Sequence, residues 1–139
     1  MKSVRHGAVA ALLLFQVACG DGVGVEFTDL AGRWNAIRYE AMEEDTWETE
    51  DWIATGRMSG LTIDVTASGD AVVTVWLQGR AAPMTFAGAL SRAGTEVTFH
   101  VNGGAVVGAV ALDLNLLTVT MPSFPLNGED YGLVMTLKR

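Results

Sequence analysis

The stretch Asp29-Leu30-Ala31-Gly32-Arg33-Trp34-Asn35 opens the first strand-like run of the chain and places a Gly-x-Trp at its start. The residues before it have the composition of an export signal followed by a Gly-rich linker. The residues after it alternate between apolar and polar side chains over short runs separated by turn-forming residues. The sequence therefore divides at this stretch into a targeting segment and one β-rich domain.

The composition fits one domain that is rich in strands. The chain has 139 residues, of which 50% are hydrophobic, and it uses Val, Leu, Thr and Gly heavily. A chain of this length can bury a sizeable core, and this residue mixture favours strands over helices. The formal net charge is −7, so we expect no binding to nucleic acid and no attraction to an anionic membrane surface.

Residues 1–18 have the three parts of a signal peptide. Lys2 and Arg5 form a positively charged start, and residues 8–15 form an apolar run. This run is too short to span the ~30 Å hydrocarbon core of a bilayer. The single cysteine, Cys19, follows the cleavage region, so no disulfide can form within the chain.

The residues around Cys19 resemble the cleavage site of bacterial lipoproteins, in which a small residue precedes a cysteine that becomes lipidated. The resemblance implies a membrane anchor made of acyl chains, to which each buried CH₂ adds ~0.8 kcal/mol. Gly20 follows the cysteine, which by the same resemblance implies the outer membrane of the cell envelope. Residues 19–29 are then a tether and residues 30–139 the folded domain. Secretion with an unmodified Cys19 is the alternative.

The alternation of apolar and polar side chains predicts eight strands. Most of the connections are turns of two to four residues, and Asn102-Gly103-Gly104 is a strong hairpin signal. In the first run, Tyr39 falls on the opposite face to Trp34, which indicates a bulge or a strong bend. The eight predicted strands are residues 32–42, 60–67, 71–78, 83–90, 95–101, 105–112, 116–121 and 131–138.

Such short connections make consecutive strands antiparallel neighbours, because a parallel pair needs a crossover of about a dozen residues. We predict an all-β fold, an eight-stranded antiparallel up-and-down β-barrel. A sandwich of two sheets is the alternative that the pattern leaves open. The two long connections, residues 43–58 and 122–130, would lie at the same end, which predicts one tight end and one roomy end.

Gly32-Arg33-Trp34 at the start of an eight-stranded meander resembles the lipocalins and the wider calycin group. The resemblance covers residues 30–139 and is greatest to the small lipocalin-like domains of bacterial lipoproteins. It implies that Gly32 and Trp34 mark the closed end of the barrel, with a basic residue of the last strand packed over the indole. We therefore expect Arg139 or Lys138 to make a cation–π contact with Trp34, worth ~0.5–2 kcal/mol.

The predicted open end carries the candidates for ligand binding. Trp47 and Trp52 lie in the first long connection, and we expect them to fold over the barrel mouth or over a bound apolar ligand. The expected ligand is a small hydrophobic or amphipathic molecule. Plain core packing is the alternative role of the interior residues. The remaining predicted lining residues are Met84, Phe86, Phe99, Met121 and Met135.

No pattern typical of a catalytic or metal site appears in the sequence. His100 shares a strand face with Glu96, and a solvated outer face explains this pair more simply than acid–base catalysis. The acidic residues between positions 43 and 51 lack the spacing of a calcium loop, and there is no Cys/His cluster. We therefore expect no enzyme activity, no metal and no cofactor.

Two other functions remain open at this point. The first is a non-catalytic protein-interaction or structural module of the envelope, in which the acidic loop meets a basic partner or a cationic ligand. The second is an isomerase- or cyclase-like enzyme of the calycin type, which would need His100 inside a pocket.

Overall fold

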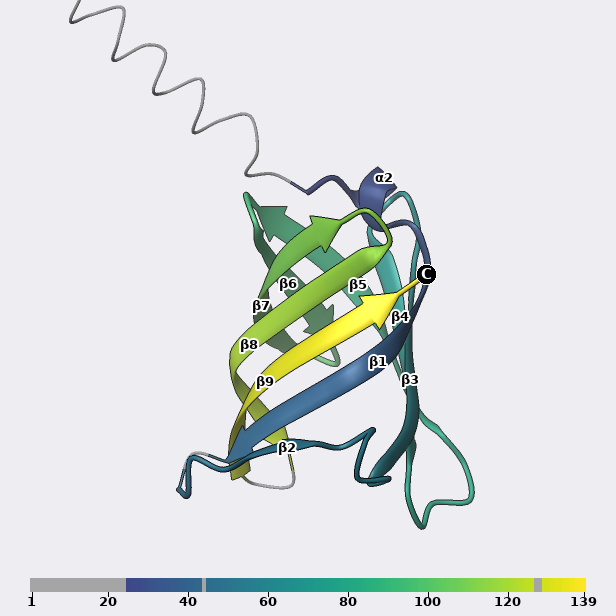
Figure 1. Ribbon diagram of the computed structural model, residues 1–139. Coiled ribbons are helices and arrows are strands. Elements are labelled where there is room, and N and C mark those ends of the chain that lie inside the picture. The colour runs from purple at the N-terminus through teal and green to yellow at the C-terminus, as the bar shows by residue number, and fades with distance from the viewer. Residues whose placement is uncertain (1–24, 44, 127–128) are drawn as a thin grey trace, which may run out of the picture.

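The computed structural model describes residues 25–43, 45–126 and 129–139, and in this part almost every residue belongs to a strand or a tight turn. Eight antiparallel strands form a closed barrel (Figure 1), which confirms the predicted up-and-down fold. The barrel strands are β1 (Gly32–Glu43), β3 (Met58–Val65), β4 (Asp70–Leu77), β5 (Met84–Ala93), β6 (Glu96–Val101), β7 (Gly104–Asp113), β8 (Leu116–Leu126) and β9 (Glu129–Lys138).

The order of the strands around the barrel follows their order in the chain. Each strand pairs with the next, and β9 returns to pair with β1 from Asn35↔Lys138 to Glu43↔Tyr131. The register of this last pair shifts between Ala36 and Arg38. This is the bulge that the broken alternation predicted, and it turns the side chains of both Trp34 and Tyr39 into the barrel.

The prediction of a long connection at residues 122–130 is wrong. Residues 122–130 are not a loop, since β8 continues to Leu126 and β9 begins at Glu129. The strand accommodates Pro122 at a register shift between Met121 and Phe124, and a proline fits a strand at a bulge or a free edge. The other long connection is present and contains a short strand, β2 (Thr49–Asp51), which pairs with the end of β1.

The closed end is sealed around Trp34, whose side chain has no exposed surface. The indole N–H donates a 2.8 Å hydrogen bond to the carbonyl oxygen of Leu30. The guanidinium carbon of Arg139 lies 4.6 Å from the indole centroid, so the predicted cation–π contact is present. Arg139 also donates hydrogen bonds to the carbonyl oxygens of Asp29 and Ala31.

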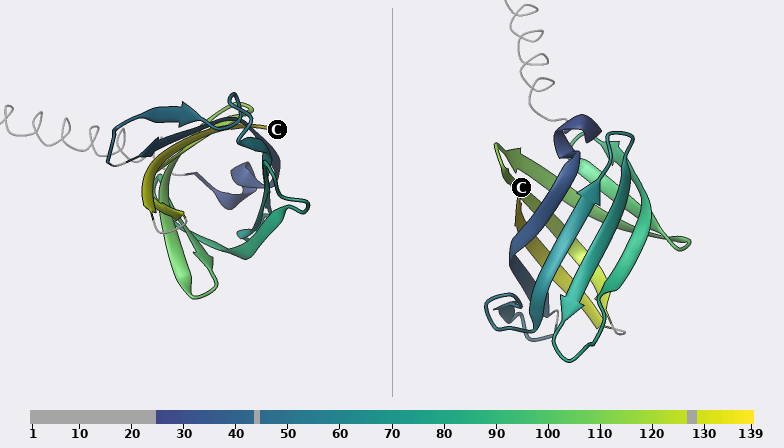
Figure 2. Two further views of the ribbon diagram at one scale, coloured as in Figure 1. Left: turned by 90° about the horizontal axis from the view of Figure 1, so that it is seen from below. Right: turned by 90° about the vertical axis from the view of Figure 1, so that its right-hand side faces the viewer.

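A single helical turn, α2 (Phe27–Leu30), lies across the closed end, where it is visible through the barrel from below (Figure 2). Phe27 packs on the β3–β4 turn so closely that a Cβ on Gly69 would lie 2.8 Å from its ring. Arg92 of β5 lies 5.6 Å from the centroid of the Phe27 ring and forms a 2.5 Å ion pair with Glu26. Residues 27–29, in the range assigned to the tether, therefore cover the barrel end.

We predict that Trp34→Phe lowers the free energy of unfolding by about 1–3 kcal/mol. The substitution leaves the buried carbonyl oxygen of Leu30 without its donor and opens a small cavity. Urea denaturation followed by circular dichroism measures the change.

Trp47→Phe is the matched control, because Trp47 is 73% exposed and its replacement should change stability by no more than ~0.5 kcal/mol. Equal effects of the two substitutions would contradict the proposed seal.

Candidate functional site

The barrel encloses an apolar cavity of about 330 Å³. All eight barrel strands contribute to its lining, together with Leu30 of α2 at the closed end and Trp52 at the open end. Apart from Tyr39 and Trp52, the lining side chains contain no nitrogen or oxygen atom. The volume falls at the lower end of the ~300–1,000 Å³ range of small-molecule sites. The cavity therefore suits an apolar molecule of modest size.

The cavity lies against one wall of the barrel. On β8 and β9, the lining residues Leu117 and Leu133 are buried. On β4, β5 and β6, the lining residues Val75, Phe86 and Phe99 are only half-buried, although they also face inward. An inward side chain keeps exposed surface only where its neighbours leave room. The open space therefore follows the wall formed by β4 to β6.

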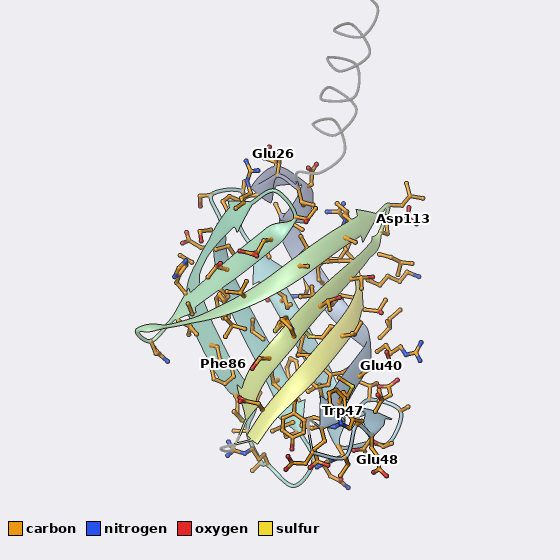
Figure 3. All side chains as sticks on the ribbon, turned by 90° about the vertical axis from the view of Figure 1, so that its left-hand side faces the viewer. Glu26, Glu40, Trp47, Glu48, Phe86 and Asp113 are labelled. Atoms are coloured by element: carbon orange, nitrogen blue, oxygen red, sulfur yellow. The ribbon has the colours of Figure 1, made fainter. Side chains whose placement is uncertain are left out.

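This wall is incomplete toward the open end of the barrel. β6 pairs with residues 89–93 of β5, so residues 84–88 pair with β4 alone. β8 pairs with residues 109–113 of β7, and beyond Thr120 it pairs with β9 alone. The hairpin that joins β6 to β7 ends between these two strands and projects outward (Figures 2 and 3). The half-buried lining residues beside this side gap are Met84, Phe86, Val101, Val106 and Met121.

Trp52 covers the axial mouth of the barrel. Its side chain is 6% exposed and lies 5.3 Å from the ring of Tyr39 and 5.9 Å from the ring of Tyr131, measured between centroids. The guanidinium carbon of Arg57 lies 4.7 Å from the Trp52 ring centroid. Arg57 in turn pairs with Glu50 at 2.5 Å. The aromatic lid is thus packed on the inside by tyrosines and covered by an ion pair.

Hydrogen bonds to the main chain fix this lid in place. The N–H of Trp52 donates to the carbonyl oxygen of Tyr39 at 2.9 Å. One carboxylate oxygen of Asp51 accepts from the N–H groups of Tyr39, Ile53 and Ala54, at 3.0–3.3 Å. Asp51 therefore joins the start of the lid to β1, and the acidic loop has a structural role that its composition did not reveal.

The structure places most, but not all, of the predicted lining residues at the cavity. Those that line it are Trp52, Met84, Phe86, Phe99, Met121 and Met135. The expectation that Trp47 folds over the mouth is wrong, because its side chain is 73% exposed and points away beside Glu48 (Figure 3). The N–H of Trp47 bonds to the carbonyl oxygen of Glu43 in a tight turn outside the barrel.

His100 lies on the outer face of β6, as its strand pattern predicts. It is exposed, and its Nε2 lies 2.8 Å from Oγ of Ser91 on the neighbouring strand. It does not line the cavity. Within the described residues, no group of three or more His, Cys, Asp and Glu side chains is arranged to hold a metal ion.

Tyr39 is a polar lining residue that the sequence did not single out. Its side chain is 5% exposed, and burial raises the pKa of its phenol to about 12 from the usual 10. The hydroxyl therefore stays protonated and uncharged at neutral pH. The bulge in β1 was the available signal, since it turns Tyr39 and Trp34 to the same side.

We predict that stability falls between about pH 10 and pH 12. Over this range the unfolded chain has lost the Tyr39 proton while the folded chain keeps it, so the unfolded state binds fewer protons and rising pH favours unfolding. The two-unit difference corresponds to a loss of at most about 2–3 kcal/mol. Chemical denaturation at several pH values measures it, and Tyr39→Phe should flatten this part of the profile. An equally steep profile in that variant would assign the loss to other groups.

A scan of protein-family models finds none that matches the chain, and a search of curated proteins finds no significant match. In the described part of the chain, no helix has the length and apolar character needed to cross a bilayer.

Proposed function

We propose that this protein binds a small hydrophobic or amphipathic molecule inside its barrel. The observation that carries the proposal is the apolar cavity of about 330 Å³, whose lining on β4 to β6 stays half-buried. Burying apolar surface stabilises a protein by roughly 25 cal/mol per Å². An apolar ligand in the cavity would bury the lining surface that is still exposed. In this proposal the ligand enters between β5 and β8, where the strands are unpaired, and does not pass Trp52.

The arrangement of Gly32, Trp34 and Arg139 supports a lipocalin-like classification. Gly32 has a φ of +121° at the turn into β1, a conformation that favours glycine. Trp34 seals the end beneath α2, and Arg139 packs over the indole. These are the contacts that the resemblance to lipocalins implied, and they hold one end of the barrel shut.

The proposed location is the bacterial cell envelope, with the protein anchored to the outer membrane through a lipid on Cys19. Both Cys19 and the signal at residues 1–18 lie outside the described residues. α2 lies at the closed end (Figure 1), and Val25, just before it, packs against the core. The six residue steps from Cys19 to Val25 reach at most ~20 Å. Such an anchor would hold the barrel by its closed end, with the mouth and the side gap directed away from the membrane.

We predict that Val75→Phe weakens binding of an uncharged apolar fluorophore, N-phenyl-1-naphthylamine, at least ~10-fold, which is about 1.4 kcal/mol. Val75 lines the cavity from β4, and the larger ring would occupy the space in which the ligand lies. Filling a cavity commonly adds ~0.5–2 kcal/mol of stability, so unfolding should require more urea. Fluorescence titration measures the affinity.

The matched control for this test is Val107→Phe. Val107 faces outward from β7 and is 43% exposed, so the same chemical change there should leave binding unaltered. If both variants bind the fluorophore as the natural chain does, the barrel interior is not the binding site.

The lipid anchor makes a separate prediction. Intact mass spectrometry of the protein extracted from its own envelope should show a chain that starts at Cys19 and carries acyl groups. Cys19→Ser should abolish the added mass and move the protein from the membrane fraction to the soluble fraction. An unmodified Cys19 in the natural chain would rule out the anchor but leave the ligand site intact.

A protein-interaction module is the second candidate function, and the exposure of Trp47 favours it. Trp47 stands 73% exposed between Asp45 and Glu48, which are also exposed, and exposed tryptophans are frequent anchors of protein interfaces. The acidic surroundings would select a basic partner. A partner from the envelope that is lost with Trp47→Ala but retained with Val75→Phe would support this function over ligand binding.

A further inference from the structure

In the part of the chain that the structure describes, Tyr39 carries the one hydroxyl group among the cavity-lining side chains. Both main-chain polar groups of Tyr39 are hydrogen-bonded, since its N–H donates to Asp51 and its carbonyl oxygen accepts from Trp52. Its phenol oxygen has no hydrogen-bond partner among the described residues, and burial alone shifts its pKa. A polar atom thus stands unpaired in an otherwise apolar site.

This oxygen is not sealed inside the protein. Within the described residues, no side-chain nitrogen or oxygen that is cut off from solvent lacks a hydrogen-bond partner. The unpaired phenol oxygen therefore keeps some accessible surface, and Tyr39 is one of the residues that line the cavity. A hydroxyl without a partner in an apolar setting is unfavourable, so a ligand that carries an oxygen atom would satisfy it.

The charges around the cavity restrict that ligand further. Among the described residues, no Lys, Arg or His side chain lines the cavity. Arg57 is the cation at the lid, but it lies 4.7 Å from the Trp52 ring centroid and is paired with Glu50. A carboxylate placed inside would be a buried charge without a partner, which is strongly unfavourable.

The shape of the site fits a single chain. The cavity extends from Leu30 at the closed end to Trp52 and Tyr39 near the mouth. Its volume of about 330 Å³ is small for the ~300–1,000 Å³ range of ligand sites. An alkyl chain placed along the β4–β6 wall would contact Val75, Phe86 and Phe99, which are among the lining side chains that remain half-buried.

We propose that Tyr39 anchors the uncharged, oxygen-bearing head of a single-chain lipid-like molecule, such as a long-chain alcohol or ester, whose alkyl chain occupies the cavity. The proposal rests on the proposed ligand-binding function and adds the chemistry and orientation of the ligand. The phenol O–H donates to the head-group oxygen, and the chain runs from Tyr39 toward the closed end.

The test uses the full chain and three probes of equal chain length, 1-decanol, decanoate and 1-chlorodecane, each competing with N-phenyl-1-naphthylamine. At neutral pH we expect 1-decanol to bind more tightly than decanoate, and the difference to shrink at about pH 4, where the acid becomes neutral. Tyr39→Phe should weaken 1-decanol about 2- to 10-fold, the range of one net hydrogen bond, and leave 1-chlorodecane unchanged.

Phe99→Leu is the control, since it alters the apolar lining without touching a polar atom and should affect all three probes alike. The proposal is overturned if Tyr39→Phe weakens 1-decanol and 1-chlorodecane equally, or if decanoate binds as tightly as 1-decanol at neutral pH. Those results would leave ligand binding in place. If none of the probes and not even the fluorophore binds, the proposed function itself fails.

Discussion

The seal at Trp34 is the constraint on which the rest of this barrel depends. The first and last strands meet there, and their pairing closes the sheet. The indole donates its N–H to the carbonyl oxygen of Leu30 inside a site with no exposed surface, while Arg139 covers the ring. Because a buried polar group needs its partner, this bond fixes α2 across the barrel end. The cavity is therefore closed at this end of the barrel.

The barrel has a cavity because the inward side chains differ in size around it. β1, β3 and β9 supply Trp34, Tyr39, Met58 and Met135, and these pack to near-complete burial. β4, β6 and β7 supply six valines together with Ala71 and Gly108, which are short residues, beside the larger Leu77 and Phe99. In an eight-stranded barrel the interior is just wide enough for side chains to fill it, so short residues on one wall leave a cavity beside that wall.

Most of the strands could be predicted from the sequence, because the alternation of apolar and polar residues along a strand shows which side chains face inward. The bulge near Tyr39 was predictable for the same reason, whereas the contact between Trp34 and Arg139 was expected from the resemblance to lipocalins. The end of β8 was not, since Pro122 is a turn signal in sequence and becomes acceptable only where β7 has left the edge free. Trp47 was misplaced because its direction depends on a turn with Glu43, which composition cannot show. The side gap also escaped prediction, because it results from how far each pair of strands overlaps.

The side gap leaves backbone hydrogen-bonding groups without strand partners. In the described chain, residues 84–88 of β5 and the end of β8 are each paired on one edge only. Free edges promote wrong pairing between chains, and the prolines of β8 limit this by removing N–H donors. Trp52, in contrast, is held by its main-chain bond to Tyr39 and by the turn around Asp51. Opening the mouth would break these bonds, whereas passage between β5 and β8 would break none of them. For the proposed ligand, exchange between β5 and β8 would therefore leave Tyr39 and the lid in position.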